Sequence, residues 1–209
     1  ILLMTSMRGW DMVGHDIERE FRVFTLTAQE GRWDMGLYRD SYNACLSITV
    51  MPQMLSAMLG VSGIIVFKLL LQFAFAGCVT VIYILLRQYA PKLGALTGSL
   101  LFICYPTFIN DAAMLTRQGV AYLFFALAIF IISNKVQRWR YKTLFLLCAV
   151  GAVLSHYSTA YMFVALFGLA VACKYIAKWW HARKHGPETV SREKTVLSPL
   201  FAAALLLCT

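Results

Sequence analysis

The chain has 209 residues, of which 60% are hydrophobic and 14% are charged, and its net charge is +9. A typical soluble domain has roughly a quarter of its residues charged, so this composition argues against a soluble globular protein. The basic residues flank apolar runs, which indicates membrane topology and no nucleic-acid partner. The six cysteines are scattered without a CxxC pair, so they indicate neither a metal centre nor a redox compartment.

Apolar runs of membrane-spanning character follow a polar first segment. Residues 1–9 look like the end of a preceding span, and residues 10–43 are polar and charged. Four apolar runs come next, at residues 44–60, 61–86, 93–109 and 118–134. Pro52 interrupts the first of them, which suggests a short re-entry. Because a bilayer core of ~30 Å takes about 20 apolar residues per helix, the pattern predicts an all-α, polytopic transmembrane protein.

Residues 143–173 carry no charge over 31 positions. As one helix this run would be about 46 Å long, too long for one upright span and short for two. The polar sequence 155–159 lies near its middle, and both flanks are basic. Since basic loops prefer the cytoplasm, we expect a hairpin that bends at His156 and Tyr157. A further span is expected from about residue 195.

The charges are divided between two sets of connecting segments. Twelve of the 19 Lys and Arg residues fall at 87–92, 135–142 and 174–194, and eight of the ten acidic residues fall at 10–43 and at Asp111. The positive-inside tendency places the basic segments in the cytoplasm. We therefore expect one transmembrane domain over residues 1–209, an excerpt of a longer chain, in the plasma membrane and with loop 10–43 extracytoplasmic.

The first loop contains a predicted amphipathic helix. Ile17, Phe21, Phe24 and Ala28 follow a helical spacing, so residues 17–28 are expected to form a helix lying on the membrane surface. Asp16 and Glu20 are four residues apart and would face the same side.

Three interpretations of Asp16 and Glu20 are open from spacing. The pair of carboxylates could hold a divalent cation, or one of them could act as a general base. The structural alternative is a solvated helix face with Asp16 as the N-terminal cap.

Three further positions are candidates for function. Asp111 and Arg117 lie in the second outer loop and at the top of the next span, where they could serve a site or simply pair with each other. Lys68 lies eight residues into an apolar run and could snorkel to the interface or bind an anionic head group. His156 and Tyr157 could bind substrate or form a hydrogen-bonded turn.

Several short motifs resemble the integral-membrane glycosyltransferases of the GT-C superfamily, and most closely a prokaryotic branch of it. The likeness covers most of residues 10–175, and its motifs are at residues 14–20, 46–52, 67–68, 116–119 and 155–159. The resemblance implies the N-terminal part of a GT-C-like core and a polyprenyl-phosphate-linked sugar donor. By position in the motif, Asp16 would be the catalytic base. Asp111 would shape the site or hold a metal.

The resemblance also suggests ligand contacts. Arg117, Lys68 and His156 would contact the lipid phosphate or the sugar, and Tyr157 adjoins them. Asp16, Glu20 and Asp111 would be the ligands of a divalent ion, Mg or Mn.

The expected function is transfer of a sugar to an extracytoplasmic glycan or lipid acceptor. The alternatives are a transporter or flippase for lipid-linked oligosaccharides and a scaffold subunit. A transporter would place ionisable residues near the middle of its spans, and the apolar runs here contain almost none.

Overall fold

The computed structural model describes residues 1–134 and 139–185, and every regular element in these ranges is helical. In chain order the elements are α1 (Leu2–Ser6), α2 (Ile17–Glu30), α3 (Val50–Leu59), α4 (Gly63–Ile65), a π-helical turn (Val66–Leu70), α5 (Leu71–Leu86), α6 (Lys92–Ile103), α7 (Pro106–Asn110), a 3-10 turn (Ala112–Met114), α8 (Thr116–Ser133), α9 (Trp139–Ser155) and α10 (Tyr157–His185). This confirms the predicted all-α class. The span expected from about residue 195 lies outside the described residues.

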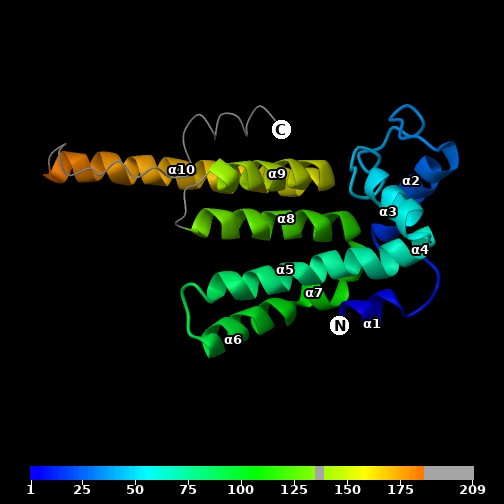
Figure 1. Cartoon of the computed structure of the whole chain (residues 1–209), viewed down its shortest axis with the longest axis horizontal. Coiled ribbons are helices and arrows are strands. Elements are labelled where there is room, and N and C mark those ends of the chain that lie inside the picture. The colour runs from blue at the N-terminus through cyan, green and yellow to red at the C-terminus, as the bar shows by residue number, and fades with distance from the viewer. Residues whose placement is uncertain (135–138, 186–209) are drawn as a thin grey trace.

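Three helices are long and apolar enough to cross a membrane: Gly63–Leu86, Thr116–Ser133 and Tyr157–Trp180. At 1.5 Å per residue they are about 36, 27 and 36 Å long, against a hydrocarbon core of ~30 Å. In Figure 1 α8 lies between α5 and α9, and α10 extends beyond them. The chain is therefore a polytopic membrane protein, as the apolar runs predicted.

The span expected over residues 93–109 is wrong as a single helix. The structure has α6 and α7 there, separated at Cys104 and Tyr105. Pro106 begins α7 and has no N–H to donate, and it forces Tyr105 into extended backbone with ψ 132°. The twelve residues of α6 reach about 18 Å, so this helix is too short to cross the bilayer.

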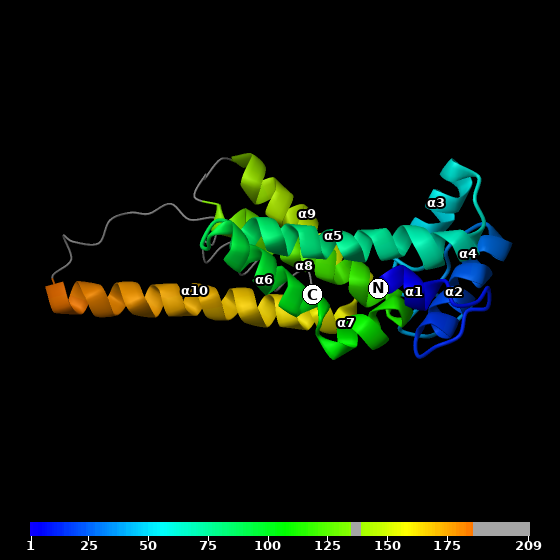
Figure 2. The same cartoon turned by 90° about the horizontal axis from the view of Figure 1, so that it is seen from below.

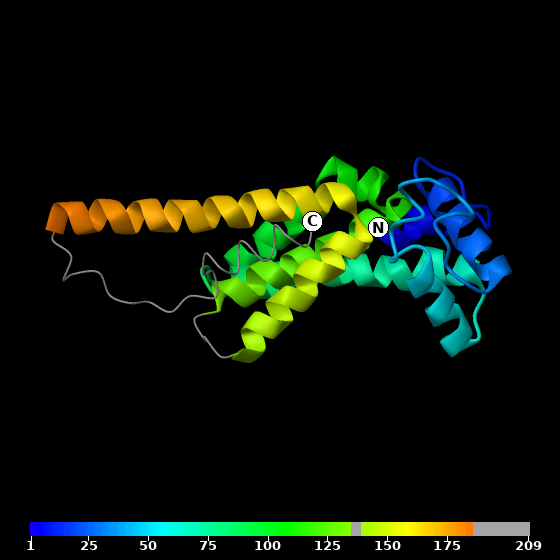
Figure 3. The same cartoon turned by 90° about the horizontal axis from the view of Figure 1, so that it is seen from above.

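The uncharged run 143–173 is divided at His156, as predicted from its length and its polar centre. The two helices together extend beyond the run at both ends, because α9 begins at Trp139 within the preceding basic segment and α10 continues to His185. Figures 2 and 3 show α9 and α10 diverging from this junction while both lead back toward the same end of the molecule.

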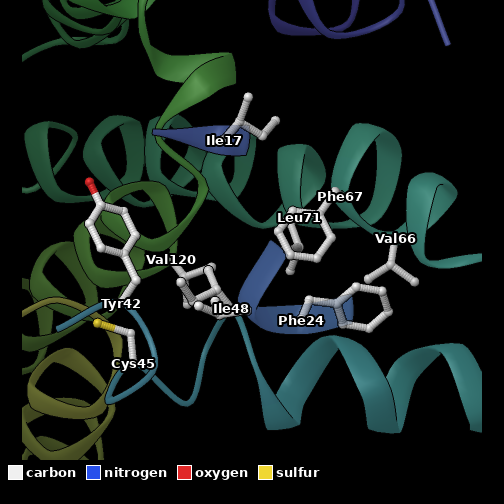
Figure 4. Close-up of a cluster of buried hydrophobic side chains, with 10 residues drawn as sticks. Ile17, Phe24, Tyr42, Cys45, Ile48, Val66, Phe67, Leu71 and Val120 are labelled. Carbon is white, nitrogen blue, oxygen red and sulfur yellow. The ribbon is translucent and has the colours of Figure 1, made fainter. Parts of the chain in front are cut away.

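Helix α2 confirms the amphipathic helix expected in the first loop. Its apolar side is buried through Ile17, Val23 and Phe24, and it ends at Gly31, whose φ of 65° suits glycine. This side packs on Ile48, Phe67 and other residues of a buried cluster (Figure 4). Figure 1 places α2, α3, the start of α8 and the α9–α10 junction at one end of the bundle. The α5–α6 connection lies at the opposite end.

Candidate active site

Arg117 is the centre of the candidate site. It is the second residue of α8, and 4% of its side chain is exposed. Its Nη2 donates to Oδ2 of Asp16 at 3.0 Å, and its Nε lies 3.4 Å from Oε1 of Glu20. The guanidinium carbon lies 3.7 Å from the centre of the Tyr42 ring and 5.4 Å from that of Tyr157. Arg117 therefore joins the first loop, the start of α8 and the start of α10.

Glu20 is completely buried and closes the N-terminus of α8. Its Oε2 accepts the backbone N–H of Thr116 at 3.0 Å, and its Oε1 accepts that of Arg117 at 3.3 Å. The first N–H groups of a helix have no partner within the helix, so this carboxyl supplies one from a distant segment. The expected solvated helix face is therefore wrong for Glu20. Burial raises its pKa to about 7, against the opposing effects of Arg117 and the two N–H groups.

Asp16 is the accessible member of the pair. It occupies the position before α2 but makes no capping hydrogen bond there, and its carboxylate pairs with Arg117 instead. About a third of its side chain is exposed (32%). The predicted common face of Asp16 and Glu20 is thus observed, with one carboxyl inside the protein and the other at the surface.

Tyr42 is a site residue that the sequence reasoning missed. Its backbone N–H donates to Oδ1 of Asp40 at 3.0 Å, which fixes the turn that presents the ring, and 8% of the residue is exposed. Nearby Cys45 is also buried, which raises the pKa of its thiol. A tyrosine in a polar loop carries no periodic signal, and its partner Arg117 is remote in sequence.

His156 and Tyr157 form the side of the site that comes from α9 and α10. The His156 ring is buried, and its Nδ1 lies 2.8 Å from Oγ1 of Thr159. Burial and the nearby charge of Arg117 lower its pKa to about 4. Tyr157 is 44% exposed, and its ring centre lies 5.3 Å from that of the His156 ring.

Two hydrogen bonds attach the first loop to the α9–α10 junction. Leu46 N–H donates to the Leu154 carbonyl at 2.9 Å, and the Ser47 hydroxyl donates to the Ser155 carbonyl at 3.3 Å. These bonds satisfy carbonyl groups at the end of α9.

Lys68 and Asp111 have their contacts elsewhere. Lys68 is buried in the π-helical turn, and its Nζ donates to the carbonyls of Ser6 at 3.0 Å and Gly9 at 2.5 Å. It lines a cavity of about 300 Å³. Asp111 faces His15, with 3.8 Å between Oδ1 and Nε2. The structure thus brings Asp16, Glu20 and Tyr157 around the guanidinium of Arg117. It gives Lys68 and Asp111 other partners.

Two of the predicted metal ligands, Asp16 and Glu20, are engaged by Arg117 in this arrangement. Arg117 binds both Asp16 and Glu20, so a metal ion between these carboxyls would have to displace the guanidinium. No group of three or more His, Cys, Asp or Glu side chains suited to a metal occurs within residues 1–134 and 139–185. Binding of Mg or Mn stays a prediction, and the proposed reaction uses neither ion.

The comparisons with known proteins returned nothing: the chain matches no family model, no curated protein and no solved structure. What the site can do is therefore inferred from its own residues. They are an accessible carboxylate, a buried cation that fixes it, and an exposed aromatic ring at the end of apolar helices.

Proposed function

We propose that this chain belongs to an integral-membrane glycosyltransferase that moves a sugar from a polyprenyl-phosphate donor to an extracytoplasmic glycan or lipid acceptor. The observation that carries the proposal is the carboxylate of Asp16, 32% exposed and held at 3.0 Å by a buried arginine where the apolar helices end. A base at this boundary can meet a water-soluble acceptor and a membrane-bound donor together. The motifs that resemble the GT-C superfamily add to this support.

In the proposed reaction Asp16 removes the proton of an acceptor hydroxyl. The acceptor oxygen forms a bond to the anomeric carbon of the sugar, and the bond from that carbon to the phosphate oxygen breaks. The electron pair leaves with the polyprenyl phosphate. Arg117 orients the Asp16 carboxylate, because its Nη2 donates a hydrogen bond to Oδ2 at 3.0 Å.

An apolar cavity on α8 supports a lipid-linked donor. It has a volume of about 180 Å³ and is lined by Phe75, Phe102, Tyr105, Thr107, Phe108, Ala112, Leu115, Gln118, Gly119 and Tyr122. The first turns of α8 therefore carry both this cavity and Arg117. An isoprenoid chain has the apolar character that such a lining accepts.

The position of charges within the spans favours an enzyme over a transporter. The described spans carry their Lys and Arg residues near their ends: Lys68, Arg117, Lys174 and Lys178. A transporter that moves lipid-linked oligosaccharides would need polar groups near the midplane. The proposed orientation in the plasma membrane has Asp16 outside, on the basis of the basic connections.

The test is sugar transfer by the purified protein in lipid nanodiscs, with a synthetic polyprenyl-phosphate sugar and a panel of acceptor glycans and lipids. Replacing Asp16 with Asn should lower the rate by ~100- to 10,000-fold without lowering the folded yield. Glu18→Gln is the matched control, because Glu18 is exposed on the same helix. Transfer by Asp16→Asn within a fewfold of wild type would remove Asp16 as the base.

A further inference from the structure

His156 stands where one membrane helix ends and the next begins. Its backbone N–H donates to the Ala152 carbonyl at 3.0 Å, which completes α9. Its backbone carbonyl accepts the N–H of Ala160 at 3.0 Å, which starts α10. His156 therefore occupies the N-cap position of α10, and its side chain is placed by two helices at once.

The contacts of Nδ1 determine which ring nitrogen carries the proton. Nδ1 accepts the backbone N–H of Thr159 at 3.3 Å, and an N–H group can only donate. The Nδ1 lone pair is therefore in use, and the Thr159 hydroxyl 2.8 Å away must also donate to it. A neutral imidazole has one protonated nitrogen, so the proton lies on Nε2.

Nε2 is the unused donor of this ring. It makes no hydrogen bond to the residues that the structure describes. It is also not among their fully buried side-chain atoms that lack a hydrogen-bond partner, so Nε2 is accessible to a ligand. Its neighbour Tyr157 is 44% exposed and faces Arg117, which in turn holds Asp16. The Nε2–H group thus belongs to the same end of the molecule as the accessible carboxylate.

We propose that His156 is a neutral, substrate-orienting residue whose Nε2–H donates a hydrogen bond to a sugar oxygen beside Asp16 and Tyr157. The proposal rests on the proposed function and deepens it. A sugar offers hydroxyl and ring oxygens that accept such a bond, its C–H face packs on a tyrosine ring, and its hydroxyls donate to a carboxylate. This triad of groups suits the sugar part of the donor or acceptor.

The same geometry excludes His156 as a general base. A base needs a free lone pair, but Nδ1 is occupied by Thr159 and Nε2 carries the proton. The nearby charge of Arg117 opposes a second proton on the ring. Proton removal is therefore assigned to Asp16, and His156 contributes to substrate binding.

Two replacements of His156 distinguish its role as the N-cap of α10 from its role as a hydrogen-bond donor through Nε2–H. His156→Asn retains an acceptor near the position of Nδ1, and Asn is a preferred N-cap residue, but it loses Nε2–H. His156→Gln places an amide N–H near the position of Nε2 but caps poorly. We expect His156→Asn to fold as wild type with KM for the sugar substrate raised about three- to tenfold and kcat within about twofold, which is the loss of one neutral hydrogen bond. We expect His156→Gln to be less stable and to keep KM within about twofold of the wild-type value.

A purely structural role predicts the reverse order, with KM unchanged in His156→Asn, and that result would overturn the proposal. A kcat that falls by about two orders of magnitude or more in both variants would also overturn it, because a loss of that size marks a proton-transfer role. Absence of transfer by the wild-type protein would instead contradict the proposed function.

NMR spectroscopy determines the tautomer of His156 independently of any transfer assay. In protein with ¹⁵N-labelled histidine at pH 7, the resonances lost in His156→Gln are those of His156. We expect an unprotonated Nδ1 and a protonated Nε2. A protonated Nδ1, or an imidazolium with both nitrogens protonated, would contradict the assignment.

Discussion

The guanidinium carbon of Arg117 lies 3.7 Å above the Tyr42 ring, although one residue begins a membrane helix and the other lies in the loop before α3. Both side chains are nearly buried. A cation flat on an aromatic face and shielded from water is stabilised by about 2 kcal/mol. This contact therefore holds the first loop against α8.

Two replacements of Tyr42 should distinguish the contribution of its ring to stability from that of its hydroxyl. Tyr42→Phe keeps the face over Arg117, so its free energy of unfolding should stay within about 1 kcal/mol of wild type. Tyr42→Ala loses the face and leaves a cavity, so a destabilisation of about 3–5 kcal/mol is expected. Thermal unfolding in detergent micelles measures both. Equal effects of Phe and Ala would show that the ring face contributes nothing.

Arg117 and Glu20 should be energetically coupled. Arg117→Met leaves the buried Glu20 without a cation and should cost about 3–5 kcal/mol of stability. In the double variant with Glu20→Gln the unpaired charge is gone, so the loss should fall short of the sum of the single losses by about 1–3 kcal/mol. A double-mutant cycle of unfolding free energies measures this, with the exposed Arg87→Met as control. Additive losses would rule out the coupling.

The raised pKa of Glu20 gives a stability difference that depends on pH. Between pH 4.5 and about 7 the folded protein retains a proton at Glu20 that the unfolded chain releases. The contribution of this bound proton to the free energy of unfolding is fully present below pH 4.5, and it is lost as the pH rises through about 7. The unfolding free energy of wild type minus that of Glu20→Gln should therefore fall over this range.

His156 has the opposite effect in the same experiment. Its pKa is lowered to about 4, so its contribution to stability is lost as the pH falls from 6.5 through 4. Both proteins contain His156, so subtraction removes its contribution. A difference that rises or stays flat from pH 4.5 to about 7 would contradict the protonation of buried Glu20.

The two ends of the bundle should lie on opposite sides of the membrane. In a cysteine-free background, Glu18→Cys in α2 should react with an impermeant maleimide added to intact cells. Arg87→Cys, in the α5–α6 connection, should react only after the cells are opened, because basic connections favour the cytoplasm. Labelling yield on gels provides the readout. Reaction of Arg87→Cys in intact cells would reverse the proposed orientation.

Periodicity and charge were sufficient to predict much of the fold. The runs at 61–86 and 118–134 match two of the observed spans, and Ile17, Phe21 and Phe24 predicted the apolar side of α2. These features depend on local spacing, which a sequence displays directly. Hydropathy does not reveal the break at Pro106 within the run 93–109, because the backbone restriction that Pro106 imposes on Tyr105 decides the structure there.

The candidate site was only partly predictable for a different reason. Asp16 and Glu20 were expected to share a face, but spacing does not tell which carboxyl is buried. That depends on Thr116 and Arg117, whose N–H groups are brought to Glu20 by the tertiary fold. The stacking of Tyr42 and the contacts of Lys68 with Ser6 and Gly9 likewise join segments that are distant in sequence.

The hydrogen bonds of Glu20 to Thr116 and Arg117 span 96 and 97 residues of chain. A ribosome makes the carboxyl first and its partners only after α5, α6 and α7, so for several seconds at about 5–20 residues per second Glu20 has no native partner. During that time water must solvate the Glu20 carboxyl in place of these N–H groups. The contacts of Glu20 form only after α8 has been made. His156 and Tyr157 join the site later still, with α9 and α10. Assembly of the site is therefore a late event of biogenesis, and truncation before α8 should leave Glu20 without the N–H groups of Thr116 and Arg117.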